Sequence, residues 1–118
     1  MLKSKLHRVT VTDVNIQYEG SLEVDQELLA LADIRKGEQV HVYNVTNGNR
    51  FVTYAVEGPA GERQIRVLGA AGRLVAKGDI ILIVTYADYD ETELPNYQAT
   101  VIQFAAGNEP KYNHASNA

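Results

Sequence analysis

The feature that most constrains the fold is an unbroken apolar run in the second half of the chain, Ile80-Ile81-Leu82-Ile83-Val84-Thr85-Tyr86. The turn residues Lys77-Gly78-Asp79 precede it. A short apolar run bounded by turn residues is typical of a strand whose two faces are both covered. The run therefore predicts a fully buried strand, around which other strands must be arranged.

Shorter segments rich in β-branched residues predict the remaining strands. They occupy residues 5–14, 21–24, 40–45, 51–56, 64–68 and 100–104. Asn47-Gly48 lies between two of them and predicts a hairpin with a tight primed turn, because such turns need positive φ at their central residues. Six or seven short strands favour a mainly β fold, a small β-barrel, over an α/β sheet.

One helix is expected, with Asp25 as its N-cap and its end before Lys36-Gly37. Its apolar residues recur near helical spacing at Leu28, Leu29, Leu31 and Ile34. From Gly107 onward the sequence is polar, which predicts a flexible tail over about 107–118.

Length and composition exclude several classes of protein. A chain of 118 residues predicts a single domain, 1–118. The net charge of −4, without a basic cluster, argues against binding to nucleic acid or to an anionic membrane. The absence of cysteine excludes disulfides and thiolate chemistry. No signal peptide or apolar run of membrane-spanning length is found, so a cytoplasmic protein is expected.

Two pairs of polar residues suggest a binding pocket. Lys5 and His7 are two apart on the first strand and share a face, and Arg50 and Tyr54 share a face of the hairpin's return strand. Together they describe a pocket for an anionic substrate with a proton donor at hand. The alternative is that they are solvated strand residues. Scattered histidines and an irregular acidic cluster at 88–93 predict no metal site.

Four segments, in order and in register, resemble the pyruvoyl-dependent aspartate decarboxylase family. They are Lys3-Ser4-Lys5-Leu6-His7-Arg8-Val9-Thr10-Val11-Thr12, Tyr18-Glu19-Gly20-Ser21, the hairpin Asn44 to Tyr54, and Gly69-Ala70-Ala71 with Gly78-Asp79-Ile80-Ile81. The resemblance runs from the first residues to about Phe104. It implies a double-psi β-barrel with one or two short helices, assembled as a homotetramer with active sites between subunits.

The resemblance also implies a covalent cofactor. Gly20-Ser21 would be cut by attack of the Ser21 hydroxyl on the preceding carbonyl, which gives a β chain, 1–20, and an α chain, 21–118, capped by a pyruvoyl group. That group would form a Schiff base with L-aspartate and support its decarboxylation to β-alanine and CO2, which feeds pantothenate synthesis.

Site residues follow by the same resemblance. Tyr54 would return the proton to the carbanion, and Arg50 would hold a substrate carboxylate. The substrate site would further contain Lys5, His7, Thr53, Gly69, Ala70 and Ala71, with Tyr18 and Tyr43 as walls.

One residue departs from the family pattern, because Leu68 stands where the family usually has asparagine before Gly-Ala-Ala. Leucine removes a hydrogen-bond donor and acceptor beside the expected cleavage site. Two hypotheses remain: a self-processing aspartate decarboxylase, and an unprocessed or inactive β-barrel that binds a small carboxylate. Retention of Ser21, Arg50 and Tyr54 together favours the enzyme.

Overall fold

The computed structural model describes the backbone of residues 1–116 and the side chains of residues 1–111. Its strands are β1 Leu2–Thr10, β2 Asp13–Asn15, β3 Ser21–Asp25, β4 Gln39–Asn44, β5 Arg50–Gly58, β6 Ile65–Leu68, β7 Ile80–Tyr86, β8 Ala99–Ala105 and β9 Glu109–Ser116. The helices are α1 Gln26–Ala32 and three short 3-10 helices, η1 Gly69–Arg73, η2 Glu91–Asn96 and η3 Ala106–Asn108. The prediction of a mainly β fold is confirmed.

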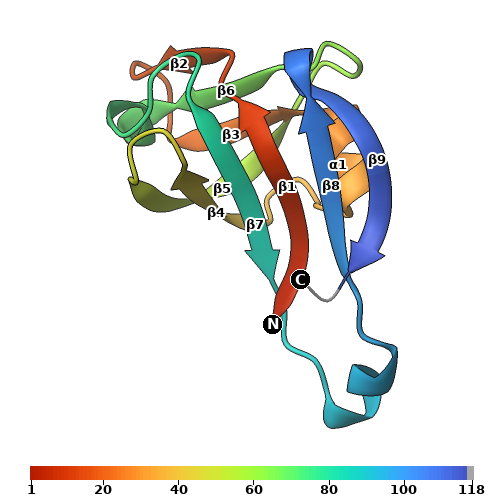
Figure 1. The fold of residues 1–118 in the computed structure, drawn as a ribbon. Helices are drawn as coiled ribbons and strands as arrows, with labels where there is room; N and C mark the ends of the chain where they lie inside the picture. Colours follow the sequence, from red (N-terminus) through yellow and green to blue (C-terminus); the bar gives the residue numbers. More distant parts are fainter. Residues whose placement is uncertain (117–118) are drawn as a thin grey trace.

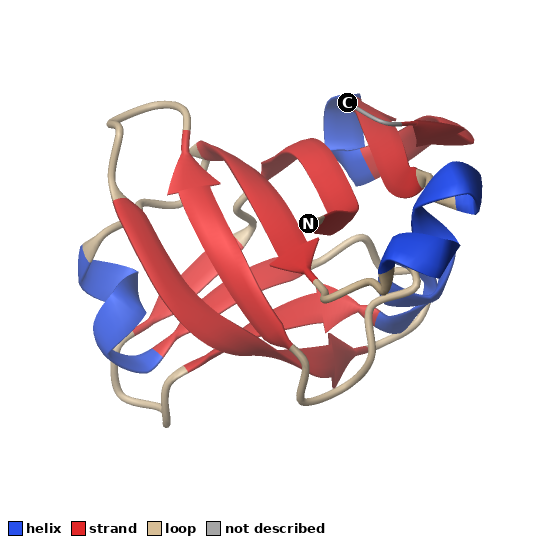
Figure 2. Ribbon diagram, turned by 90° about the horizontal axis from the view of Figure 1, so that it is seen from below, coloured by secondary structure: helices blue, strands red, loops and turns tan. Residues whose placement is uncertain are grey.

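All nine described strands belong to one sheet in the order β2-β6-β3-β5-β4-β7-β1-β8-β9. Figure 1 shows β7, β1, β8 and β9 side by side, and Figure 2 shows the strands wrapping around a common interior. The interior is filled by aliphatic side chains from almost every strand and from α1. Fully buried members include Leu6, Leu22, Val24, Leu28, Val42, Ile65, Ile81, Ile83 and Ile102.

The apolar run 80–86 is the strand β7, paired antiparallel with β4 on one side and β1 on the other. Ile81 and Ile83 are completely buried, whereas Ile80 and Leu82 are only half-buried. The prediction of full burial is therefore wrong for Ile80 and Leu82, although Val84 on the same face is only 3% exposed. That face lies on the outside of the curved sheet (Figure 2).

Two strands exceed the six or seven expected. The segment 5–14 divides into β1 and β2, which pair with different strands, β7 and β8 for β1 and β6 for β2. The expected tail instead contains β9 over residues 109–116, antiparallel to β8. The sequence of β9 lacks alternating apolar residues, because its pairing with β8 at the edge of the sheet is made by backbone groups. Residues 117 and 118 lie outside the described residues.

Two local predictions were right about the element and wrong about its end. The β4–β5 hairpin forms, but five residues, 45–49, connect its strands, and only Gly48 of the pair Asn47-Gly48 has positive φ. The helix α1 begins after Asp25 as expected and ends at Asp33, which adopts the left-handed conformation at φ 57°. No helix in the described part of the chain is long and apolar enough to cross a membrane.

Asp25 joins the start of α1 to the loop before β6. Its carboxylate is fully buried and accepts backbone N–H groups of Glu27 at 2.8 Å, Gly61 at 3.0 Å and Arg63 at 2.7 Å. The guanidinium of Arg63 lies 3.4 Å away. Burial alone raises the pKa of a carboxyl group, but these donors outweigh burial and hold the pKa of Asp25 below its usual value.

We expect Asp25→Asn to lower the free energy of unfolding by about 3 kcal/mol, because an amide nitrogen would face the N–H of Arg63. The lowered pKa means that the contribution of Asp25 is present above its unfolded pKa and is lost as pH falls through the folded one. Urea unfolding between pH 7 and pH 3 should therefore show a smaller acid loss in the variant. Glu27→Gln, which removes an exposed partner of Arg63, should cost less than about 1 kcal/mol. An equal loss of unfolding free energy in the two variants would contradict this account.

Candidate active site

Ser21 begins strand β3, directly after the turn that contains Gly20. Its backbone pairs with Leu68 of β6, and the two following pairs are Leu22 with Val67 and Glu23 with Arg66. By strand alternation Ser21 shares a face with Glu23, while Leu22 and Val24 point into the core. Ser21 is only 5% exposed although Gly20 is exposed. The hydroxyl is thus held beside the Gly20–Ser21 peptide in a covered position.

The Gly69-Ala70-Ala71 segment follows Leu68 and approaches Gly20, the residue before Ser21. A Cβ atom added to Gly69 would lie 2.5 Å from Cα of Gly20, 2.7 Å from its nitrogen and 2.9 Å from the carbonyl oxygen of Tyr18. The backbone of Gly69 also has φ of +79°. Only glycine allows both this conformation and this approach. The structure therefore brings Gly69 against Gly20, the residue after which the sequence predicts cleavage.

Gly20 itself is not strained. A Cβ atom on Gly20 would meet only the carbonyl oxygen of Leu68, at 4.0 Å, and its φ lies outside the left-handed region. Glycine at position 20 is able to adopt backbone angles that other residues avoid, but it does not do so here. The structure places that backbone demand at Gly69 instead.

Strand β5 carries Arg50 and Tyr54 on one face. Both side chains are exposed and alternate with half-buried Phe51 and Thr53, so the prediction of a shared face is confirmed. Thr53 pairs with the buried Val40 and lies on the opposite face from Tyr54. Its side chain does not join the group around Arg50.

Tyr54 is also near Ser21 in the sheet. The parallel pair Leu22 with Ala55 places Ser21, one residue earlier, level with Tyr54 on the neighbouring strand. Tyr54 and Ser21 thus come together within one chain. Arg50 lies four residues before Tyr54, at the start of β5, about 13 Å away in strand rise.

An aromatic cluster surrounds Arg50 on the outer face. The guanidinium carbon of Arg50 lies 4.6 Å from the ring centroid of Tyr43, and the Tyr43 hydroxyl lies 2.8 Å from that of Tyr86. The ring of His41 contacts Tyr86 edge-on, with centroids 5.0 Å apart. The hydrogen bond between the Tyr86 and Tyr43 hydroxyls, and then burial, raise the pKa of Tyr86, while the charge of Arg50 lowers it. His41 is therefore part of this cluster and not an isolated surface residue.

Lys5 and His7 lie on the same outer face but on β1. Arg50 pairs with Tyr43, Tyr43 with Leu82 and Leu82 with His7, so one row of residues crosses four strands. Three strand spacings separate Arg50 from His7, about 14 Å. Within one chain, Lys5 and His7 do not join Ser21, Tyr54 and Arg50.

The surroundings of His7 disfavour its protonated form. Burial, followed by the positive charges of Lys5 and Arg8, lowers its pKa. Its Nδ1 atom is buried and has no hydrogen-bond partner among the described residues. The Lys5 charge acting on His7 agrees with the prediction that the two side chains share a face.

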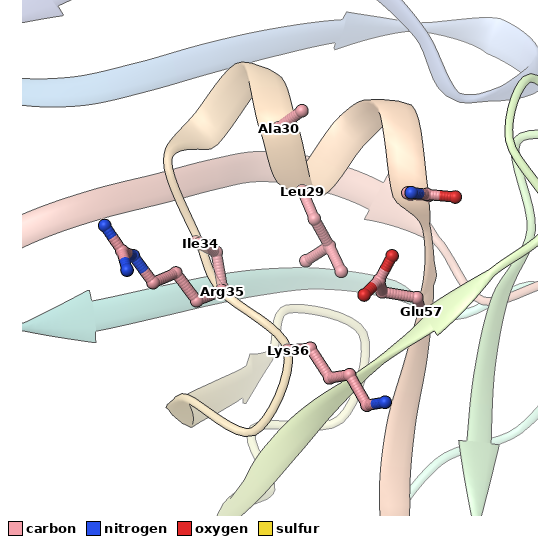
Figure 3. Close-up of a pocket in the computed structure, with 7 residues that line it drawn as sticks. Leu29, Ala30, Ile34, Arg35, Lys36 and Glu57 are labelled. Atoms are coloured by element: carbon pink, nitrogen blue, oxygen red, sulfur yellow. The ribbon is translucent and has the colours of Figure 1, made fainter.

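A separate groove lies away from all these residues. It has a volume of about 370 Å³ and is formed between α1, the segment after it, and β5 (Figure 3). Its lining residues are Gln26, Leu29, Ala30, Ile34, Arg35, Lys36 and Glu57. None of them is a site residue expected from the sequence, so the candidate site is an outer sheet surface in the single chain.

Sequence reasoning missed Tyr86. It was assigned only as the last residue of a buried strand, yet it is exposed and contacts Tyr43 and His41. An aromatic residue with a hydroxyl at the end of an apolar run was the available signal. The partner depends on the β4–β7 register, which local sequence does not report. Tyr18, expected as a wall, is 59% exposed beside Gly20.

Gly69→Ala tests the close approach of its segment to Gly20, with Gly61→Ala as the matched control. Gly61 has φ of +82° and nothing within 4 Å of an added Cβ, so alanine there should cost only about 1 kcal/mol for the left-handed backbone. Gly69→Ala should cost about 1–3 kcal/mol more, because its Cβ overlaps the Gly20 backbone. Both are measured by urea unfolding in a Ser21→Ala background, which keeps Gly20–Ser21 intact. Equal costs would mean that the segment moves away without penalty.

Comparison with known proteins finds relatives over almost the whole chain. A family model described as aspartate decarboxylase matches residues 1–111. The aspartate 1-decarboxylase of Syntrophobacter fumaroxidans is 52% identical over 110 residues, which cover 93% of this chain and 89% of the relative. The enzyme of that name from Caulobacter vibrioides is 50% identical over 108 residues, 92% of each chain. The one from Pseudomonas fluorescens is 48% identical over 118 residues, all of this chain and 92% of the relative. The resemblance expected from the sequence is confirmed, and the chain belongs to the aspartate decarboxylase family.

Proposed function

We propose that this chain is an aspartate 1-decarboxylase, a carboxy-lyase that converts L-aspartate to β-alanine and CO2 for pantothenate synthesis. Family membership over almost the whole chain supports the reaction. The observation that carries the proposal is the close packing of Gly69 against Gly20, beside the covered Ser21 and level with Tyr54. A barrel that only bound carboxylates would have no need of this arrangement.

The first step of the proposal is cleavage of the chain by its own serine. The Ser21 hydroxyl attacks the Gly20 carbonyl carbon, and the peptide C–N bond breaks to leave an ester and a free amine. Loss of the Ser21 α-proton expels the Gly20 carboxylate and leaves a dehydroalanine residue. Hydrolysis of that residue releases ammonia. The products are 1–20 with a free carboxylate and 21–118 with an N-terminal pyruvoyl group.

The residues present fit such a group. Gly69 has no side chain where a Cβ would overlap Gly20, so space beside the new terminus is kept free of bulk. Ser21 is anchored by its pairing with Leu68, which fixes where the terminus starts. When formed, the pyruvoyl ketone supplies an electron sink for loss of the substrate carboxylate.

The remaining residues bind the substrate and handle protons. The exposed guanidinium of Arg50 binds a carboxylate of L-aspartate, for which its planar donors are suited. Tyr54, level with Ser21, donates the proton that replaces the departing CO2. Ala70 and Ala71 follow Gly69 and line the substrate site with backbone groups, as does Thr53 through its main chain.

We further propose a homotetramer with active sites between subunits, located in the cytoplasm. Lys5 and His7 lie three strands from Arg50 and further still from Ser21, so they reach a shared site only from a second subunit. The outer sheet face is suited to such contact. Its exposed apolar side chains include Val52, Tyr54 and Tyr86.

The second candidate function is an unprocessed barrel that binds a small carboxylate. Leu68 favours it, because this buried apolar side chain stands beside Ser21 where the family pattern has a hydrogen-bonding residue. The two functions make different predictions for the intact mass and for β-alanine formation.

Mass spectrometry of the purified protein tests the cleavage. We expect two chains, 1–20 and 21–118, with the larger one lighter by one ammonia than a chain beginning with serine. Ser21→Ala should give one intact chain, no β-alanine and an unchanged melting temperature, because the side chain contributes little to the core. An intact parent chain after long incubation would support the unprocessed barrel, and absence of β-alanine from L-aspartate would refute the enzyme.

Arg50→Ala separates substrate binding from cleavage. Loss of a charged bidentate contact should lower kcat/KM for L-aspartate by about 100-fold, while the two-chain mass pattern stays as in the parent. Arg35→Ala removes an arginine that lines the separate groove, and it should keep kcat/KM within about twofold. A similar loss in both variants would argue against a specific role for Arg50.

A further inference from the structure

Arg50 has the charge to bind a carboxylate but no ion pair to hold it in place. Its side chain is exposed at the start of β5, and no carboxylate of the described residues pairs with it. A free arginine side chain loses considerable rotamer freedom when it binds a ligand. The contact that limits this freedom is the ring of Tyr43, 4.6 Å from the guanidinium carbon.

The Tyr43 ring is fixed in turn by Tyr86. The two hydroxyl oxygens lie 2.8 Å apart, which is a hydrogen bond between β4 and the end of β7. The ring of Tyr86 is oriented by the edge-on contact with His41, at an interplanar angle of 89°. A series of contacts therefore runs from His41 through Tyr86 and Tyr43 to Arg50.

We propose that Tyr86 is a positioning residue for substrate binding, which sets the Tyr43 ring through the hydroxyl pair and thereby orients the Arg50 guanidinium toward a carboxylate. Tyr86 has no direct contact with the reacting atoms in this arrangement. The inference rests on the proposed function, in which Arg50 binds a carboxylate of L-aspartate.

Tyr86 lies away from the residues of the chemical step, so its substitution should change substrate binding and leave that step unchanged. Ser21 and Tyr54 lie on β3 and β5, whereas Tyr86 lies on β7, beyond β4 in the sheet. The hydroxyl pair therefore acts on ground-state affinity through Arg50. Cleavage and the proton donor Tyr54 should be unaffected by its loss.

The experiment compares Tyr86→Phe, Tyr43→Phe and the double variant with the parent holoenzyme. Each single variant removes the same hydrogen bond and keeps both rings. KM for L-aspartate should rise about 3- to 10-fold in each, with kcat within about twofold. KM should rise no further in the double variant than in either single variant, because each single substitution already removes the hydrogen bond between the two hydroxyls. Tyr89→Phe, outside this cluster, should behave as the parent.

Calorimetric titration with succinate provides a readout that needs no turnover. Succinate carries the two carboxylates of the substrate but has no amine, so it binds without reacting. Its Kd should rise by the same factor as KM in Tyr86→Phe and Tyr43→Phe, and should be unchanged in Tyr89→Phe.

Different results would overturn different statements. Kd and KM within twofold of the parent in Tyr86→Phe would refute the positioning role, as would a fall in kcat alone or an additive loss in the double variant. A parent that binds succinate in a Tyr86-dependent way but forms no β-alanine would refute the proposed function and support this inference. A parent that binds no succinate would count against both.

Discussion

The register of β7 against its two neighbours is the constraint on which the outer face depends. Leu82 is opposite Tyr43 on one side and His7 on the other, and Val84 is likewise between His41 and Lys5. The core residues Ile81 and Ile83 fix this register, because a shift by one residue would turn them outward. The same pairing therefore buries the interior and arranges the cationic and aromatic residues in rows outside it.

The region of the proposed cleavage depends on a second constraint, the close approach of two backbones. Ser21 is tied to β6 by strand pairing, and β6 ends at the residue before Gly69. The left-handed Gly69 then turns the chain against Gly20 without a side chain between them. One short strand thus fixes the position of both the serine and the segment that packs against Gly20.

The sequence predicted the elements that local patterns specify. The apolar run 80–86, the β4–β5 hairpin and the start of α1 all follow from side-chain periodicity and from turn or capping residues. Long-range pairings were not predictable, because they depend on strand order. Examples are the row from Arg50 to His7, the contact of Gly69 with Gly20, and the pairing of β9 with β8. Shared strand faces suggested Lys5, His7, Arg50 and Tyr54, and the family resemblance supplied their roles and the other site residues, but neither indicated Tyr86.

The separation of the site residues follows from the sheet. Side chains that bind a charged substrate must avoid the apolar interior, since a buried unpaired charge is costly. The outer face meets this need, but the strand order places β5, β4 and β7 between Ser21 on β3 and the pair Lys5 and His7 on β1. A second copy that packs its own outer face on this one would bring the two groups together and exclude water from them. In the proposed tetramer, the fold of each chain thus supplies only part of each site, and association completes it.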